Sequence, residues 1–85
     1  MVRHLGVFVL PNCLACDTAV RLARQVGTMN MDRVRVRIID LSVAGAVKPA
    51  AVFAVPTYLL DGRLLSLGNP DEEWLLNQLA TTRTA

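Results

Sequence analysis

Residues 5–17 contain the stretch that decides the fold, LGVFVLPNCLACD. It begins with an apolar run at residues 5–10 and ends with Cys13 and Cys16, the two cysteines of the chain. An apolar run closed by a proline is typical of a strand that is buried on both faces in the middle of a sheet. Helical periodicity starts directly after it, so we expect the cysteine pair at the junction between a buried strand and a helix.

The predicted helix covers residues 13–26. Its apolar side chains fall on one arc of the helical wheel and its polar side chains on the other, and Gly27 follows where a C-terminal cap belongs. Residues 34–41 alternate at first and then become apolar, which predicts a second strand. A strand, a helix and a strand in this order favour a right-handed crossover and a parallel pair of strands.

Three arginines, Arg33, Arg35 and Arg37, project from one face of the second predicted strand. They fit two interpretations. One is an anion-binding stripe, and the other is a solvated face that discourages pairing at the edge of the sheet. We prefer the second interpretation, which agrees with a place for this strand at the sheet edge.

The second half of the chain predicts a loop, a hairpin and a last helix. Residues 42–54 are rich in alanine and valine, and we expect a loop followed by a short helix that starts near Pro49. Asp61-Gly62 separates two apolar runs, which is a strong signal for a two-residue hairpin turn. Asn69 is the expected N-cap of the last helix.

These elements follow in the order β-α-β-(α)-β-β-α and predict an α/β fold in a single domain, residues 1–85, with a core at about 5–79. A four-stranded mixed sheet in the order 2-1-3-4, with helices on both faces, satisfies the parallel first pair and the antiparallel last pair. Of the 85 residues, 53% are hydrophobic and 19% charged. This composition is too apolar for a disordered chain, and the length is too short for a doubly wound cofactor domain.

Composition also bounds the setting in which the protein works. No apolar run approaches the roughly 20 residues that cross a bilayer, and the N-terminal residues lack the apolar stretch of a secretory signal. We therefore expect a cytoplasmic monomer with no membrane partner. In a reducing compartment a cysteine pair is more often catalytic or metal-binding than structural. The net charge of +2 is weak and the nine cationic residues are scattered, so we expect no nucleic-acid partner.

The position of the two cysteines predicts different roles for them. Free amide groups of the first helical turn and the helix dipole both favour a thiolate at Cys13. Cys16 lies one turn further along, on the apolar arc, where burial opposes a charge. A first thiol that attacks a disulfide and a second thiol that resolves the mixed disulfide would suit this arrangement.

Two motifs together resemble the thioredoxin and glutaredoxin superfamily: the Cys13–Cys16 pair between a strand and a helix, and Val55-Pro56-Thr57 before the hairpin. The resemblance covers about residues 5–79 and implies a thioredoxin-like fold of the minimal glutaredoxin type. It implies a cis-proline at Pro56 that faces the cysteine pair. It also implies a dithiol–disulfide oxidoreductase without a cofactor, in which Val55, Pro56 and Thr57 bind the substrate and the Val55 backbone pairs with its chain.

The chain departs from both branches of that superfamily. Leu14-Ala15 separates the cysteines, no tryptophan precedes them, and Val7 stands where thioredoxins carry a buried aspartate. No lysine stands shortly before the motif, and Gly68-Asn69 replaces the Gly-Gly pair of glutaredoxins. We therefore expect poor use of glutathione. The expected partners are a disulfide-containing protein or a small-thiol substrate, and an unidentified reductase.

Other interpretations of the cysteine pair remain open. The pair can be inert core packing, and the chain can be a thioredoxin-fold binding module without redox turnover. A metal or iron–sulfur site is a further alternative, but two thiolates supply only half of a zinc site. The single histidine, His4, stands at the other end of the first predicted strand. A metal site would therefore have to be shared between chains, and we expect none within one chain.

Overall fold

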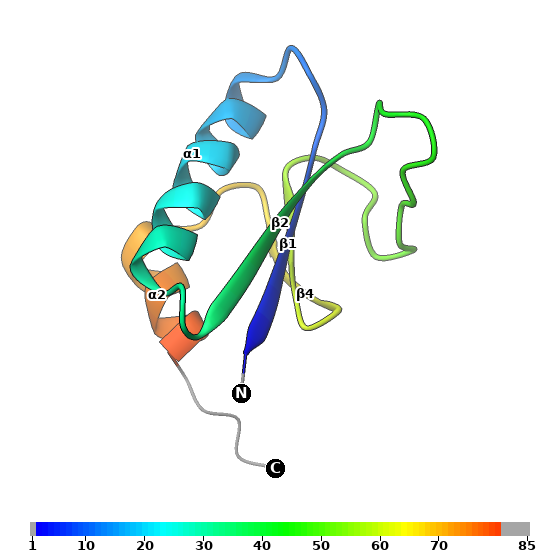
Figure 1. Cartoon of the computed structure of the whole chain (residues 1–85). Coiled ribbons are helices and arrows are strands. Elements are labelled where there is room, and N and C mark those ends of the chain that lie inside the picture. The colour runs from blue at the N-terminus through cyan, green and yellow to red at the C-terminus, as the bar shows by residue number, and fades with distance from the viewer. Residues whose placement is uncertain (1, 81–85) are drawn as a thin grey trace.

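The computed structural model describes residues 2–80 of the chain. The elements follow in the order β1 (Arg3–Val9), α1 (Leu14–Met29), β2 (Val34–Asp40), β3 (Thr57–Leu60), β4 (Arg63–Leu67) and α2 (Glu72–Ala80) (Figure 1). Among these residues the strands form one four-stranded sheet in the order β2-β1-β3-β4. The β1–β2 pair is parallel, and the β1–β3 and β3–β4 pairs are antiparallel. The predicted α/β class, mixed sheet and strand order are confirmed.

The central place of β1 follows from its composition. Because β1 pairs with a strand on each side, its backbone groups are satisfied within the sheet, and its side chains can be buried on both faces. Leu5, Val7 and Val9 point to one face, whereas Phe8 points to the other. β1 therefore contributes to two hydrophobic clusters, one on each face of the sheet.

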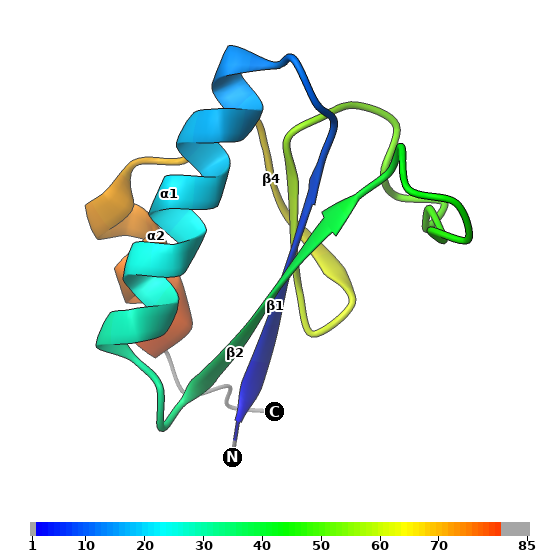
Figure 2. The ribbon, with the colours of Figure 1, turned by 45° about the horizontal axis from the view of Figure 1, so that its top comes forward.

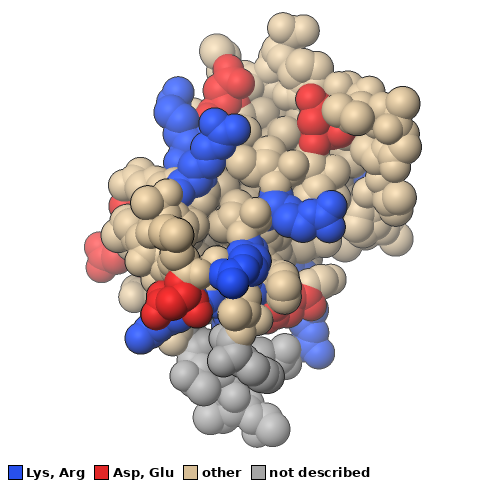
Figure 3. All heavy atoms as spheres, in the orientation of Figure 1, with Lys and Arg blue, Asp and Glu red and all other residues tan. Residues whose placement is uncertain are grey.

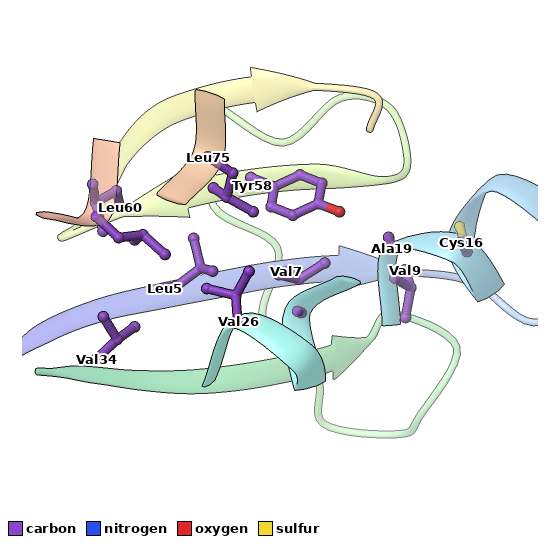
Figure 4. Close-up of a cluster of buried hydrophobic side chains, with 12 residues drawn as sticks. Leu5, Val7, Val9, Cys16, Ala19, Val26, Val34, Tyr58, Leu60 and Leu75 are labelled. Atoms are coloured by element: carbon purple, nitrogen blue, oxygen red, sulfur yellow. The ribbon is translucent and has the colours of Figure 1, made fainter. Parts of the chain in front are cut away.

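Both helices pack on the same face of the sheet (Figures 1 and 2). Figure 4 shows side chains of β1, β2, β3 and both helices meeting in the larger cluster on that face. Its fully buried members include Val7, Val26, Tyr58 and Leu75, each 0% exposed. The fold thus has one well-filled layer between the sheet and its two helices.

The expectation of helices on both faces is wrong. The opposite face is covered by the long connection between β2 and β3, at residues 41–56, and no helix occurs in it. A smaller cluster of Phe8, Val52 and Leu59 lies beneath this connection. The short helix expected near Pro49 is reduced to a turn, because a six-residue segment cannot repay helix nucleation and Val55 precedes a proline.

Two predicted helix ends differ from the structure. α1 continues through Gly27 to Met29, and Asn30 caps it by donating its side-chain amide to the Val26 carbonyl oxygen at 2.9 Å. In α2 the carboxylate of Asp71, not Asn69, accepts the backbone N–H of Trp74 at 3.2 Å. Neither Gly27 nor Asn69 acts as the expected cap, because each makes a contact between elements. Gly27 lies against Val36 of β2, and the Asn69 side chain bonds Tyr58 and Ala15.

The predicted hairpin between β3 and β4 is confirmed. Asp61 and Gly62 have φ values of 51° and 82°, and positive φ at both central residues is what a type I′ turn requires. The hairpin brings Asp61 beside the start of β1, where its carboxylate accepts the backbone N–H of His4 at 2.9 Å. Within residues 2–80, no helix has both the length and the apolar character needed to cross a membrane.

Candidate dithiol site

A tight turn carries the chain from β1 into α1. Asn12 has a φ of 58°, in the left-handed region that asparagine tolerates better than most residues. Cys13 follows in an extended conformation, with φ −128° and ψ 111°, and is the N-cap of α1. The first helical hydrogen bond runs from the Asp17 N–H to the Cys13 carbonyl oxygen at 3.0 Å. The sequence predicted this junction, but it placed Cys13 inside the helix and not at its cap.

The Cys13 thiol occupies the position that serine or aspartate usually takes at a helix start. Its Sγ accepts the backbone N–H of Cys16 at 3.1 Å, and the residue is partly exposed. Such a sulfur faces amide groups that have no partner inside the helix, and it lies at the positive end of the helix dipole. Cys13 therefore caps α1 with its sulfur while staying partly exposed to solvent.

Cys16 has a different environment one turn further along α1. It is buried, with 1% of its surface exposed, within the larger hydrophobic cluster (Figure 4). Burial and the hydrogen bond with Cys13 raise the pKa of the Cys16 thiol, and the Leu10 amide opposes this rise only in part. No disulfide joins Cys13 and Cys16 in this structure.

A hydrogen-bonded relay ties α1 to the strands beside the cysteines. The Tyr58 hydroxyl donates to the Asn69 Oδ1 at 2.9 Å, and the Asn69 Nδ2 donates to the Ala15 carbonyl oxygen at 2.9 Å. Ala15 lies between the two cysteines. Burial, followed by the negative charge of a Cys16 thiolate, raises the pKa of Tyr58 to about 12. The relay therefore holds the backbone of the cysteine turn in place, and the Tyr58 hydroxyl that donates its first hydrogen bond stays protonated at neutral pH.

Sequence reasoning missed both members of this relay. Tyr58 lies in a strand whose four residues are all buried. A tyrosine in such a strand needs a hydrogen-bond partner for its hydroxyl group, and this requirement could have pointed to the relay. Asn69 also fits the pattern of a helix N-cap, and this local pattern led away from its bonds to Tyr58 and Ala15. Helix capping is a local pattern, whereas the relay joins residues 54 positions apart.

The segment of Val55, Pro56 and Thr57 lies at the start of β3, and the Val55–Pro56 bond is cis, as expected. Val55 is partly buried at the rim of the same cluster against which Cys13 packs. The Pro56 carbonyl oxygen accepts the Gly68 N–H at 2.8 Å, and Asn69, the next residue, reaches the cysteine turn. These bonds bring the segment and the cysteine pair to the same end of the sheet.

The three residues of this segment differ in what they offer to a bound molecule. Pro56 and Thr57 are buried, and the Thr57 hydroxyl donates to the Ala54 carbonyl oxygen at 2.5 Å. Thr57 therefore anchors the end of the connection before β3. Val55 is the most exposed of the three.

An apolar surface surrounds Cys13. Leu14, the next residue, is 87% exposed, and Leu10 is 40% exposed. Covering a leucine side chain that is almost wholly in water is favourable, because it removes apolar surface from the solvent. This end of the molecule thus combines a partly exposed thiol with an apolar rim formed by Leu10 and Leu14.

The donor set of the site fits thiol chemistry better than metal binding. Within residues 2–80 no group of three or more histidine, cysteine, aspartate or glutamate side chains could hold a metal ion. Cys13 and Cys16 alone can exchange disulfides, since the first is accessible and the second lies behind it. Neither a scan against protein-family models nor a search of curated proteins gives a match for this chain.

Proposed function

We propose that the chain is a small thioredoxin-like thiol–disulfide oxidoreductase that uses Cys13 and Cys16 as its dithiol. One observation carries the proposal: the Cys13 Sγ is the N-cap acceptor of α1, 3.1 Å from the Cys16 N–H, with a buried second thiol one turn behind it. The element order and the sheet order β2-β1-β3-β4 support the likeness to the minimal glutaredoxin type.

The proposed reaction moves two electrons from the protein to a substrate disulfide. The Cys13 thiolate attacks one substrate sulfur, a new S–S bond forms, and the other substrate sulfur leaves as a thiolate that takes up a proton. The Cys16 thiol then loses its proton and attacks the Cys13 Sγ. This second attack breaks the mixed disulfide, and the departing substrate sulfur takes up a proton. The products are a Cys13–Cys16 disulfide and a substrate dithiol, and a dithiol reductase returns the protein to its reduced form.

The apolar rim suggests how a substrate is held. An extended peptide would pair with the Val55 backbone as an added strand and cover Leu14 and Leu10. Pro56 shapes this groove, and Thr57 holds its backbone in place. The substrate segment beside its disulfide would then be apolar, because the side chains that it covers are leucines.

Glutathione is expected to be a poor reductant of the oxidised protein. The segment from Phe8 to Asn12 has no basic residue, and Gly68-Asn69 replaces a Gly-Gly pair, with the Asn69 side chain committed to Tyr58 and Ala15. An assay that couples glutathione to glutathione reductase should show turnover far below that of a dithiol glutaredoxin measured beside it. Comparable turnover would mean that these absences were misinterpreted.

The test of the proposed function is a pair of trapping variants. Cys16→Ala removes the resolving thiol without burying a hydroxyl group, so mixed disulfides on Cys13 should accumulate and appear on a non-reducing gel. Cys13→Ser is the matched control, because serine is itself a good N-cap and keeps the helix start intact. The control should trap nothing, and mass spectrometry of the Cys16→Ala complexes would identify the substrates.

A second measurement makes the assignment of the two thiols independent of any substrate. Alkylation of the reduced protein at neutral pH should modify Cys13 and leave Cys16 unmodified, since burial holds the Cys16 pKa above its ordinary value. If Cys16→Ala traps nothing and both variants bind the same partners as the wild type, the oxidoreductase proposal fails. The chain would then be a binding module of the same fold.

A further inference from the structure

An open groove runs along the free edge of β2, between this strand and the C-terminal half of α1. It encloses about 750 Å³ and is lined by Arg24 and Thr28 of α1, Met31 of the turn, and Val36 and Ile38 of β2, among others. Val36 and Ile38 are partly exposed, and they form its apolar floor. The groove lies along residues that the dithiol chemistry does not use, so what it binds is a separate question.

The hydrogen bonds between β1 and β2 fix which backbone groups face this groove. The Arg3 N–H bonds the Arg33 carbonyl oxygen at 2.7 Å, and the Leu41 N–H bonds the Val9 carbonyl oxygen at 2.9 Å. In a parallel pair, alternate residues of a strand face the same neighbour. Odd-numbered residues of β2 therefore face β1, and Val36 and Ile38 direct their N–H and C=O groups outward.

The outer edge of β2 is regular and has no neighbouring strand among the described residues. β2 pairs with β1 residue for residue over seven positions, without a register shift. The opposite edge strand, β4, has a shift between Tyr58 and Leu59 in its pairing with β3, and such irregularities commonly protect edges. β2 lacks this protection, so its outward groups form a template for one more strand.

Positive charge flanks this edge on both faces of the sheet. Arg24 lines the groove on the helix side, and Figure 3 shows basic side chains over α1 and β2. Arg35 and Arg37 are exposed and alternate with Val36 and Ile38 along the strand. The Arg35 side chain also lines the groove, where its guanidinium donates to the Met31 carbonyl oxygen at 2.7 Å, so Arg37 supplies the charge on the opposite face. The nearest carboxylates along the chain are those of Asp32 and Asp40, just before β2 and at its end. An incoming strand would thus meet arginine on either side of its backbone.

We propose that the β2 edge binds an extended acidic segment of a partner protein as an added strand. Its backbone would bond the N–H and C=O groups of Val36 and Ile38, and its carboxylates would pair with Arg24 and Arg35 at the groove and with Arg37 on the opposite face. A second copy of this chain fits poorly. Antiparallel pairing of two β2 edges would set the Arg35–Arg37 stripes against each other, and like charges across a strand pair are destabilising.

The same arginines also account for selectivity. Their positive charge disfavours pairing with a second copy of β2 and with basic strands, which is the protective role of charged edge residues. They favour only a strand of opposite charge, so protection and recognition are two effects of one stripe.

The test uses a capped ten-residue peptide that alternates glutamate and threonine, with a lysine-and-threonine peptide and a single-stranded oligonucleotide as competing probes. Backbone amide NMR spectra of the full chain follow each titration. The glutamate peptide should bind and shift the amide signals of Val36 and Ile38, and the lysine peptide should not. The double variant Arg35→Glu/Arg37→Glu should weaken glutamate-peptide binding by about tenfold or more and should gain binding of the lysine peptide.

A matched variant separates recognition from general attraction. Arg21→Glu/Arg63→Glu makes the same change in net charge at two exposed positions outside the groove, and it should bind the glutamate peptide as the wild type does. Equal loss of binding in both double variants would overturn the proposal, as would absence of glutamate-peptide binding to the wild type. If the oligonucleotide bound and shifted the same amide signals, the ligand of this edge would be a nucleic acid and the proposal of an acidic peptide would be wrong.

Discussion

Tyr58 shows how much one hydroxyl group organises at the end of the sheet. Its ring is fully buried in the larger cluster, and its oxygen lies toward the end that holds Cys16 (Figure 4). The bond to Asn69 is what makes burial of that oxygen tolerable. Because the phenol is the only tyrosine of the chain, its protonation can be followed without interference.

Phenolate absorbance should therefore titrate with a midpoint of about 12 in the folded protein. A raised pKa means that the contribution of the neutral phenol to stability is complete below the unfolded-state pKa of about 10 and is lost as the pH rises through the folded-state value. Tyr58→Phe should cost about 1 kcal/mol near neutral pH and should reduce the loss of melting temperature in this alkaline range. The comparison is made in a Cys16→Ala background, so that the buried thiol does not contribute.

Asp61 serves both the hairpin turn and the start of the central strand β1. Burial raises the pKa of its carboxyl, but hydrogen bonds from the His4 amide and Arg3 outweigh it, and the net shift is downward. The Arg3 Nε lies 2.5 Å from the carboxylate. A lowered pKa makes this contribution complete above the unfolded-state value of about 4, and it disappears as the pH falls through the folded-state value.

Asp61→Asn keeps the preferred type I′ sequence, since Asn-Gly suits that turn as well as Asp-Gly. The variant should lose about 0.5–1 kcal/mol of stability at pH 7 and nothing in strong acid, as measured by urea unfolding at a series of pH values. A constant difference at all pH values would show that turn conformation and not charge accounts for the effect.

At the scale of elements, Gly27 explains why α1 lies so close to β2. A Cβ at this position would be 2.9 Å from the Val36 Cγ2, closer than side chains tolerate. The glycine therefore permits a close approach in the last turn of α1 and does not end the helix. The sequence predicted that a glycine mattered here, but periodicity alone could not distinguish a cap from a packing contact with a strand nine residues away.

Gly27→Ala should lower the free energy of unfolding by about 1 kcal/mol, because the clash with Val36 exceeds the helix-propensity gain of up to about 1 kcal/mol. Val36→Ala removes the obstructing methyl groups, so the double variant should be more stable than the sum of the two single changes allows. Urea unfolding of the four proteins measures this coupling. Strict additivity would mean that α1 shifts freely to accept the alanine.

At the scale of the whole molecule, long-range order was easier to predict than local helix content. Two features were enough to predict the sheet order. The apolar run of β1 required a central place in the sheet, and the Asp61-Gly62 turn required β3 and β4 to be antiparallel neighbours. The cysteine junction was predictable because a helix start is a local feature, although the sequence placed Cys13 inside the helix and not at its cap. The covering of the second face was not, because the alanine-rich segment 49–54 resembles a helix in composition but is too short to nucleate one.

The face opposite the helices depends on Val52. This residue is 0% exposed, and it is the only residue of the long connection that is fully buried in the smaller cluster with Phe8 and Leu59. Val52→Ala should cost about 1–2 kcal/mol locally and should make residues 42–54 more sensitive to proteolysis. Limited proteolysis with peptide mapping measures this. Unchanged cleavage within the connection would show that Val52 does not hold it.

The unequal covering of the two faces has a kinetic consequence. Hydrogen exchange should divide the molecule into two cooperative units, a slowly opening unit of α1 and the central strands and a rapidly opening unit of the long connection. Cys13 belongs to the first unit, and Val55 stands at the end of the second. Under the proposed function, each opening of the connection would remove the Val55 backbone from the thiol while leaving the thiol in place. The rate at which a bound chain departs would be governed by the residues that hold the connection down, far from either sulfur.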